Sequence, residues 1–432
     1  MGASLNRHMA PLSLSGWLQR LESQHPVEID LGLERVAAVA EKLGLITSPP
    51  PTITVAGTNG KGSVVAVASA LLELSGLQVG RYTSPHLNRF NERICINGAE
   101  ASDEDLILAF DVIEQARGAI SLTYFEAATL AALWIFRQCN VDIQVLEVGL
   151  GGRLDAVNIL DADVSVITSI GLDHMDWLGD DREQIAIEKA GVARAQRPCI
   201  VAEGEPPRSL LVSLDERGAV NCMVNRDWRI ANGVLQLASG KNFQLPGIKG
   251  LLPQNIGAAI QALEVGQFCS LSQDLLDQIS GLSLPGRLSL HQLGSVELVL
   301  DVAHNVEAVV KLAQFLTQRP VTGKTIALFG VMGDKPIRDM IAACESVFDE
   351  WNLIDLSHVP RAMDPDRLAE MLKPKERVGA QGSFADLWGS VLPCSGAGDR
   401  IVVFGSFFSV GEATQLLSGQ QDEGSGARGI HC

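Results

Sequence analysis

The stretch Ile53–Ser63, ITVAGTNGKGS, joins a run of β-branched residues to a glycine-rich turn that carries one lysine. β-Branched residues favour a strand, and glycine tolerates the positive φ angles that turn backbone N–H groups toward an anion. A helix expected at Val64–Leu74 would add free amides and the positive end of its dipole. The stretch therefore predicts a strand followed by a phosphate-binding loop, in which Lys61 supplies a positive charge.

This loop differs from the common P-loop pattern GxxxxGK[ST] at two positions. Val55 stands where the first glycine belongs, and Gly62 separates Lys61 from Ser63. A tight strand-to-helix turn with a solvated lysine is therefore an alternative interpretation. Binding of a nucleotide triphosphate is the functional hypothesis that the loop favours.

The composition limits the classes of protein to which the chain can belong. Its 432 residues exceed the roughly 250–300 residues that one core usually holds, so we expect two domains. The formal charge of −17 argues against nucleic acid or an anionic membrane as a partner, because such binding needs clustered Lys and Arg. Eight cysteines without a CxxC pair, no signal sequence and no apolar run of ~18 residues indicate a cytoplasmic protein. We expect a monomer that acts on small molecules.

Short apolar runs alternate with helical patterns along most of the chain, which predicts parallel sheets covered by helices on both faces. We therefore expect an α/β fold, with an N-terminal P-loop-type parallel-sheet ATPase domain at residues 1–284 and a smaller C-terminal α/β domain at residues 287–418. Proline and glycine cluster at Ser283–Arg287, which is the linker candidate. Residues 198–250 predict a β-rich appendage, and the polar residues 419–432 predict a disordered tail.

Four chemically active groups come at the carboxyl ends of different predicted strands: the glycine loop, Ser84, Glu147 and His174. Ligands of open parallel sheets bind at that edge, so we expect the four to share one site. Ser84 and Glu147 carry the oxygen ligands that Mg²⁺ prefers, whereas histidine is a less usual ligand. His174 is either an ordinary loop histidine or a ligand of a second metal ion, which a strongly charged transition state would justify.

Three enzyme classes compete at this point: a nucleotide-driven ligase, a P-loop kinase or hydrolase, and a dinucleotide-dependent oxidoreductase. The oxidoreductase would use the glycines of Gly149–Gly152, but Leu154 stands where the GxGxxG pattern needs its last glycine. A kinase or hydrolase gives the second α/β domain no role. A ligase must hold three ligands across a cleft, and two domains that close on one nucleotide meet that need.

Nine short motifs, in order along the chain, carry a resemblance to a known family. They are GTNGKGS (Gly57–Ser63), SPHL (Ser84–Leu87), ERI (Glu92–Ile94), EVGLGGRLDAVN (Glu147–Asn158), LDHMDWLG (Leu172–Gly179), EKAG (Glu188–Gly191), PGR (Pro285–Arg287), DVAHN (Asp301–Asn305) and GSF (Gly405–Phe407). Together they resemble the folylpolyglutamate synthases, which are Mur-type peptide ligases. The stretch Ile120–Phe136 resembles the bacterial bifunctional form, which is also a dihydrofolate synthase.

The resemblance implies a role for each matching residue. It assigns ATP binding to Gly57, Thr58, Asn59, Gly60, Lys61, Gly62, Ser63, Asn255, Arg287 and Asp301. It assigns two Mg²⁺ ions to Ser84, Glu147, His174 and Lys189, the last as a carbamate formed with CO₂. It assigns dihydropteroate binding to Thr123, Tyr124, Phe125, Leu154, Asp155 and Ala156, and L-glutamate binding to His304 and Ser406. The catalytic residues are then Lys61, His174, Lys189 and Arg287, and a monovalent cation is a further candidate cofactor.

Two of these assignments compete with plainer structural interpretations. A helical lysine beside Glu188 is ordinarily part of a surface ion pair, and Phe125 on an amphipathic helix is ordinarily part of a core. The chain also departs from the family at Val306, where proline is common, and at Leu252–Gln254, before the asparagine of the ATP site.

The reaction that the resemblance implies is ATP-dependent formation of a carbon–nitrogen bond. A carboxylate of dihydropteroate or of a folate γ-glutamyl tail would attack the γ-phosphate of ATP, and the amine of L-glutamate would then displace phosphate from the acyl phosphate. The alternative is a Mur-type ligase that adds an amino acid to a UDP-muramyl acceptor. Only the pterin segments around Phe125 and Asp155 separate the two.

Overall fold

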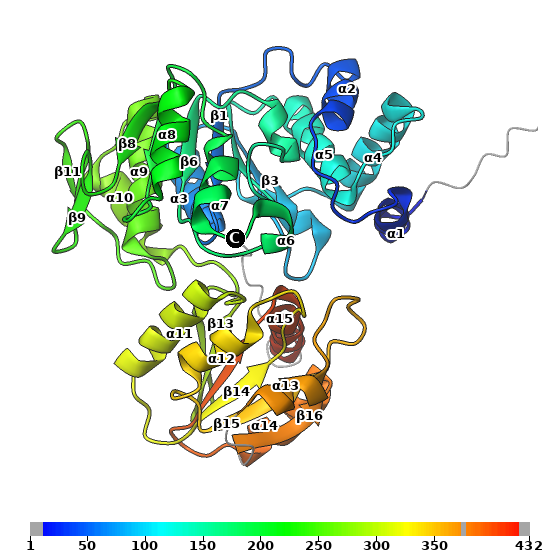
Figure 1. The fold of residues 1–432 in the computed structure, drawn as a ribbon, viewed down its shortest axis with the longest axis vertical. Coiled ribbons are helices and arrows are strands. Elements are labelled where there is room, and N and C mark those ends of the chain that lie inside the picture. Colours follow the sequence, from blue (N-terminus) through cyan, green and yellow to red (C-terminus); the bar gives the residue numbers. More distant parts are fainter. Residues whose placement is uncertain (1–11, 373–376, 423–432) are drawn as a thin grey trace, which may run out of the picture.

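The computed structural model describes residues 12–372 and 377–422 and contains two large, mainly parallel sheets (Figure 1). The N-terminal sheet has the strand order β4-β3-β2-β5-β1-β6-β7-β8. Only the edge strands β3 and β4 are antiparallel to their neighbours. The strands are β1 (Thr52–Ala56), β2 (Val79–Tyr82), β3 (Ile94–Ile96), β4 (Ala99–Glu100), β5 (Ile143–Glu147), β6 (Val164–Ile167), β7 (Pro198–Val201) and β8 (Val220–Met223).

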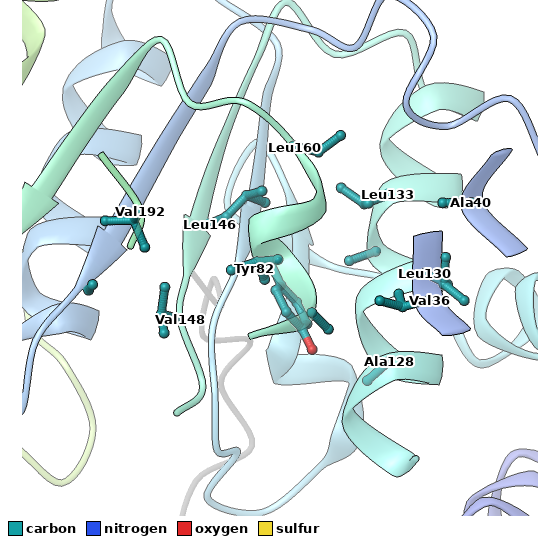
Figure 2. Close-up of a cluster of buried hydrophobic side chains, with 14 of the residues drawn as sticks. Val36, Ala40, Tyr82, Ala128, Leu130, Leu133, Leu146, Val148, Leu160 and Val192 are labelled. Carbon is teal, nitrogen blue, oxygen red and sulfur yellow. The ribbon is translucent and has the colours of Figure 1, made fainter. Parts of the chain in front are cut away.

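Strand β1 lies inside this sheet because its sequence is apolar on both faces. All five of its residues are buried, as expected of a parallel strand covered by helices on both sides. Ile53 and Val55 pack in one core with α3 (Lys61–Leu74) and α9 (Pro253–Gly266). Ala56 belongs to the core on the opposite face, where α2 (Glu34–Lys42) and α5 (Tyr124–Gln138) pack. Figure 2 shows that second core, with Tyr82 and Leu146 of the sheet beside α5.

The remaining helices surround the sheet or follow its loops. They are α1 (Leu14–Gln24), α4 (Asp103–Arg117), α6 (Met175–Leu178), α7 (Arg182–Ala190), α8 (Arg208–Glu216) and α10 (Gln273–Gln278), with 3-10 turns η1 (Phe90–Arg93), η2 (Ala156–Ile159) and η3 (Ile279–Gly281). A separate small sheet has the order β11-β10-β9 and consists of β9 (Arg229–Ala231), β10 (Val234–Gln236) and β11 (Asn242–Gln244). In the part of the chain that the structure describes, no helix has the length and apolar character needed to span a bilayer.

The C-terminal sheet has the order β12-β13-β17-β14-β15-β16, with only β12 antiparallel. Its strands are β12 (Ser289–Leu293), β13 (Val296–Asp301), β14 (Thr325–Phe329), β15 (Glu350–Ile354), β16 (Val378–Gly382) and β17 (Arg400–Phe404). Its helices are α11 (Val306–Gln318), α12 (Ile337–Cys344), α13 (Pro365–Met371), α14 (Phe384–Cys394) and α15 (Phe407–Asp422). Alternate residues of β13, β14 and β17 supply two cores, one on each face.

The α/β class and the two parallel sheets confirm the fold expected from the sequence, with corrections at the periphery. Residues 198–250 are not a β-rich appendage as a whole, because β7 and β8 extend the large sheet and α8 packs against α7. Only β9–β11 stand apart. Helix α15 continues to Asp422, residues 423–432 lie outside the described residues, and the disordered tail expected from residue 419 stays a prediction. The domain limits 1–284 and 287–418 stay predictions.

Packing between β2 and α5 generates a test of the fold. Gly80 lies in β2, and a Cβ atom built there would come within 2.7 Å of the buried Phe136 ring. Forcing a side chain into a packed core costs about 1–3 kcal/mol. We therefore expect Gly80→Ala to lower the free energy of unfolding by about that amount in urea titrations.

Gly389 offers a matched control, because a Cβ there in α14 meets no atom within 4 Å. Alanine is the better helix former, so Gly389→Ala should leave the stability unchanged or raise it. Equal stability of the two variants would show that Phe136 of α5 does not pack closely against Gly80 of β2.

Candidate active site

The glycine loop lies between β1 and α3, and its backbone conformation requires glycine. Gly60 caps α3 with φ 91°, and a Cβ there would lie 2.4 Å from Nδ2 of Asn255. At Gly57 a Cβ would lie 1.8 Å from Oγ1 of Thr168. Lys61 is the first residue of α3, and its Nζ donates to the carbonyl oxygens of Gly57 at 3.1 Å and Thr58 at 3.3 Å. Burial lowers the pKa of this lysine.

The loop is held by the end of the neighbouring strand β6. Thr168 donates its hydroxyl to the carbonyl oxygen of Asn59 at 2.8 Å, and Ser169 Oγ accepts from the Asn59 N–H at 3.0 Å. The N–H of Gly171 donates to the Thr58 hydroxyl at 3.0 Å. These contacts come from the protein itself and hold the loop in place, which lowers the cost of organising a binding site. The sequence reasoning did not single out Thr168 or Ser169.

Asn255, one of the predicted ATP-binding residues, comes to the loop from α9. It is buried, and its amide lies directly against Gly60. The structure therefore brings this residue to the phosphate loop although the two are far apart in the sequence.

Ser84 and Glu147 meet at the ends of β2 and β5. The Ser84 N–H donates to Oε2 of Glu147 at 3.2 Å. Burial raises the pKa of Glu147, while the charges of Lys61 and Arg287 oppose the shift. A Cβ at Gly62 would lie 3.6 Å from the same carboxylate, so the first turn of α3 faces Glu147. A serine hydroxyl and a carboxylate at this position fit a magnesium ion that keeps several waters.

Lys189 is buried in α7 and is not a surface lysine. Its exposed fraction is 3%, and Glu188 forms its ion pair with Arg153 at 2.9 Å instead. Burial, followed by the positive charge of Lys61, lowers the pKa of Lys189 to about 7. The surface-pair interpretation is therefore wrong. A neutral amine is the form that reacts with CO₂, so the environment suits the expected carbamate.

His174 lies at the start of α6 in a left-handed conformation, with φ 52° and ψ 42°. Burial lowers its pKa to about 4, so the ring is neutral near pH 7. Asp173, beside it, accepts from the His174 backbone N–H at 2.9 Å. Over residues 12–372 and 377–422, no three His, Cys, Asp or Glu side chains form a group able to hold a metal. Any ion here would need the Ser84 hydroxyl, water, phosphate or a modified Lys189 as well.

The segments expected to bind the pterin lie at the start of α5 and in the loop after β5. Phe125 is half-buried, and a Cβ at Gly149 would come within 2.6 Å of its ring. Its centroid lies 5.9 Å from that of Tyr82. Thr123 caps α5 through the N–H of Glu126, while Tyr124 makes an edge contact with Phe90.

Asp155, flanked by Leu154 and Ala156, uses both carboxylate oxygens to shape its own loop. They accept from Leu150 N–H at 2.8 Å and Val157 N–H at 3.0 Å. Burial raises the pKa of Asp155 to about 6. A carboxylate has about four acceptor sites, so Asp155 keeps acceptor capacity beyond these backbone contacts.

Four predicted residues come from the C-terminal domain. The carboxylate of Asp301 accepts the N–H groups of Leu288 and Ala303 at 2.8 Å each, and burial raises its pKa. The guanidinium of Arg287 lies 5.6 Å from the centroid of the Phe407 ring, and the His304 ring lies 5.7 Å from it. Ser406 is buried, and its hydroxyl contacts that of Ser409 at 2.8 Å. Arg287, His304 and Ser406 thus cluster around α15.

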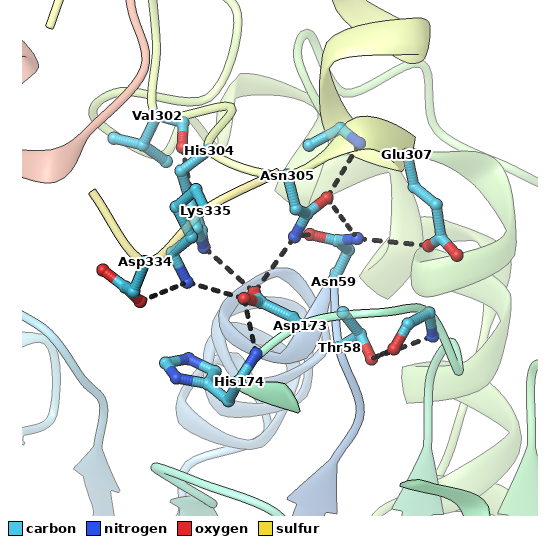
Figure 3. Close-up of polar contacts among 12 residues, drawn as sticks. Thr58, Asn59, Asp173, His174, Val302, His304, Asn305, Glu307, Asp334 and Lys335 are labelled. Atoms are coloured by element: carbon cyan, nitrogen blue, oxygen red, sulfur yellow. Dashed lines mark hydrogen bonds and ion pairs between the residues drawn. The ribbon is translucent and has the colours of Figure 1, made fainter. Parts of the chain in front are cut away.

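The two domains meet through a polar network that sequence reasoning missed (Figure 3). Asp173 contacts Lys335 at 2.6 Å, His304 at 3.5 Å and Asn305 at 3.2 Å. Asn305 also exchanges two amide hydrogen bonds with Asn59 of the phosphate loop, at 3.0 and 3.2 Å. Asp173 and Asn305 lie next to predicted site residues in the motifs LDHMDWLG and DVAHN. No signal in the sequence indicated Lys335.

The sequence and the fold match those of known proteins. Residues 55–204 match the Mur ligase middle domain, and residues 286–407 match the Mur ligase glutamate ligase domain. A dihydrofolate synthase/folylpolyglutamate synthase of Escherichia coli (strain K12) is 40% identical over 95% of this chain and 97% of its own length. A Mycobacterium tuberculosis protein of the same name is 34% identical over 81% of this chain and 79% of its own.

Solved structures of the same family have a similar fold. Escherichia coli FolC in complex with DHPP and ADP has a TM-score of 0.89 and 39% identity, covering 95% of this chain and 99% of its own. A bifunctional folylpolyglutamate synthase/dihydrofolate synthase with Mn, AMPPNP and L-glutamate bound has a TM-score of 0.87 and 38% identity, covering 94% and 98%. The chain therefore belongs to the dihydrofolate synthase/folylpolyglutamate synthase family of Mur-type ligases.

Proposed function

We propose that this protein is an ATP-dependent ligase that adds L-glutamate to dihydropteroate and to the γ-glutamyl tails of folates. The observation that carries the proposal is the meeting of a phosphate loop, the Ser84–Glu147 pair and a buried lysine with Arg287 and His304 of a second domain. The relatives with bound ADP, DHPP and L-glutamate support the same three substrate classes for this chain.

Each substrate has a proposed place. Nucleotide phosphates lie on the loop Gly57–Ser63 and against Arg287, with Asn255 and Asp301 toward the nucleoside. The pterin lies between Phe125 and the loop around Asp155, and L-glutamate lies toward His304 and Ser406. Mg²⁺ ions at Ser84, Glu147, His174 and carbamylated Lys189 would neutralise charge on the phosphates. The relatives that bind Mn support a divalent ion, and a monovalent cation is a further proposal.

The chain's own groups suit transfer of a phosphoryl group. Lys61 and Arg287 present positive charge to the phosphates, and little covalent work is left for protein side chains. The substrate carboxylate attacks the γ-phosphorus and releases ADP, and the glutamate amine then attacks the acyl carbon and releases phosphate. Closure of the C-terminal domain over the loop excludes water, which would otherwise hydrolyse the acyl phosphate.

We also propose that the protein is a cytoplasmic monomer with only small-molecule partners. The charge of −17 disfavours nucleic acid and anionic membranes, and eight cysteines without a paired motif fit a reducing compartment. Domain limits of 1–284 and 287–418 accompany this proposal, because Ser283–Arg287 precedes β12.

Substrate choice tests the function directly. The purified protein with ATP and L-glutamate should release ADP when dihydropteroate or tetrahydrofolate is added, and mass spectrometry should find the product one glutamate heavier. A UDP-muramyl acceptor should give no ADP above background. Release with the muramyl acceptor alone would establish the alternative Mur-type activity instead.

Lys61 tests the loop. Removing one charged donor from a preorganised site costs about 10²–10³ in kcat, so we expect Lys61→Ala to lose at least that factor in ADP release while its circular dichroism stays native. The control is Lys324→Ala, which alters a lysine of an exposed ion pair with Glu350. If Lys61→Ala turned over at the same rate as the control, the loop would have no role in the reaction.

The carbamate at Lys189 has its own readout, ¹³C NMR in buffer with a fixed concentration of dissolved ¹³CO₂. Because the pKa of Lys189 is lowered to about 7, the reactive neutral amine becomes more abundant as the pH rises through that value. We expect a carbamate signal that grows over this range, persists in Lys324→Met and is missing in Lys189→Met. A signal of equal size in Lys189→Met would assign the carbamate elsewhere.

A further inference from the structure

Asp173 is one of the residues through which the two domains meet. It lies in the loop after β6, beside the candidate metal ligand His174. Its Oδ1 accepts from Lys335 Nζ at 2.6 Å, and its Oδ2 accepts from Asn305 Nδ2 at 3.2 Å. Nε2 of His304 lies 3.5 Å from the same Oδ2. One carboxylate of the N-terminal domain is thus surrounded by three groups of the C-terminal domain (Figure 3).

The pair formed by Asp173 and Lys335 is buried, since each side chain is only 7% exposed. Salt screens such a pair little, and removal of either partner leaves a charge in a poorly solvated place. Arg361 and Glu28 also connect the domains, at 3.3 Å, but they are 48% and 69% exposed. Exposed pairs contribute little on average, so the buried pair is the stronger contact.

The same carboxylate also fixes the backbone of the active-site loop. Its Oδ1 accepts the N–H of His174, which has the left-handed conformation that non-glycine residues adopt only when their surroundings favour it. On the other side, Asn305 links Asp173 to Asn59 of the phosphate loop. Contacts from the C-terminal domain therefore reach both the phosphate loop and His174.

We propose that Asp173 and Lys335 are positioning residues, whose ion pair holds the C-terminal domain closed on the phosphate loop and thereby sets His174 and His304 around the same reacting atoms. The inference rests on the proposed roles of those two histidines. Neither Asp173 nor Lys335 needs to touch a substrate. Instead, their ion pair increases the fraction of molecules in which the two halves of the site are aligned.

Kinetics give the first test. Lys335→Met keeps the length of the side chain and removes its charge, and we expect kcat/KM for L-glutamate to fall at least tenfold. Lys335→Arg restores the charge and should recover part of the loss. Arg361→Met, in the exposed pair at the same interface, should change kcat/KM less than threefold. Asp173→Asn combined with Lys335→Met should cost no more than the worse single variant, because both break one interaction.

The interdomain distance gives the second test and needs no turnover. Cys139, at the end of α5, and Cys394, in α14, are exposed, one in each domain. Spin labels on these two, in a protein with Cys269→Ser and Cys432→Ser, report the separation by pulsed electron resonance. We expect Lys335→Met and Asp173→Asn to broaden the distances and shift them to longer values, whereas Arg361→Met should not.

The outcomes separate the possible failures. A purely structural role would lower the unfolding temperature of the variants without moving the distance in the folded protein, and that result would overturn the proposal. Additive kinetic losses in the double variant would overturn it as well. An absence of glutamate ligation by the unaltered protein would reject the proposed function, and the label distances would still decide whether the pair holds the domains closed. If Lys335→Met does not fold, Asp173→Asn carries both tests.

Discussion

Burial of charge at the carboxyl edge of the N-terminal sheet is the constraint on which the rest of the structure depends. The charged groups at this edge are Lys61, Glu147, Asp173 and Lys189. Removing such groups from water costs free energy unless other polar or charged groups replace the water around them. Burial lowers the pKa of both lysines and raises that of Glu147. For Asp173, burial alone would raise the pKa, but the hydrogen bond and charge of His304, together with the charge of Lys335, lower it. The C-terminal domain thus replaces water around one of the four charges.

The three other groups are left in environments that disfavour their charged forms, which is typical of functional sites. A cation beside Glu147 would favour its carboxylate, and reaction with CO₂ would turn the Lys189 amine into an anionic oxygen ligand. Anionic phosphates would favour the ammonium form of Lys61. Each ligand of the proposed reaction would therefore stabilise the charged form of a group that burial disfavours, and binding energy would act at that group. Strands β1, β5 and β6, which end at the site, are buried at every residue.

Most of the fold could be predicted from the sequence, because strands and helices follow from local patterns of apolar residues. Continuous apolar runs predicted the buried strands β1, β5 and β6, and positions at strand ends predicted that Ser84 and Glu147 meet, as the 3.2 Å hydrogen bond shows. What failed depended on tertiary context. The strands β7 and β8 lie toward one edge of the sheet, where short runs look like those of any β hairpin. Lys189 follows Glu188 on a short helix, a pattern typical of a surface, and only the packing of α7 buries it. Asp173 and Lys335 are 162 residues apart, so no spacing rule relates them.

The two departures of the loop from the ordinary P-loop have one geometric origin. Strand β1 continues through Val55 to Ala56, and Val55 is fully buried in the core shared with α3 and α9, so a glycine there would leave a cavity. The turn begins only at Gly57, and Lys61 is already the first residue of α3. The helix therefore starts early, and its second residue, Gly62, faces the carboxylate of Glu147. A longer side chain at 62 would project toward the carboxylate that is proposed to hold a magnesium ion. Glycine leaves that space open, so the shortened turn and the extra glycine together bring the glycine loop and the Glu147 carboxylate to the same point.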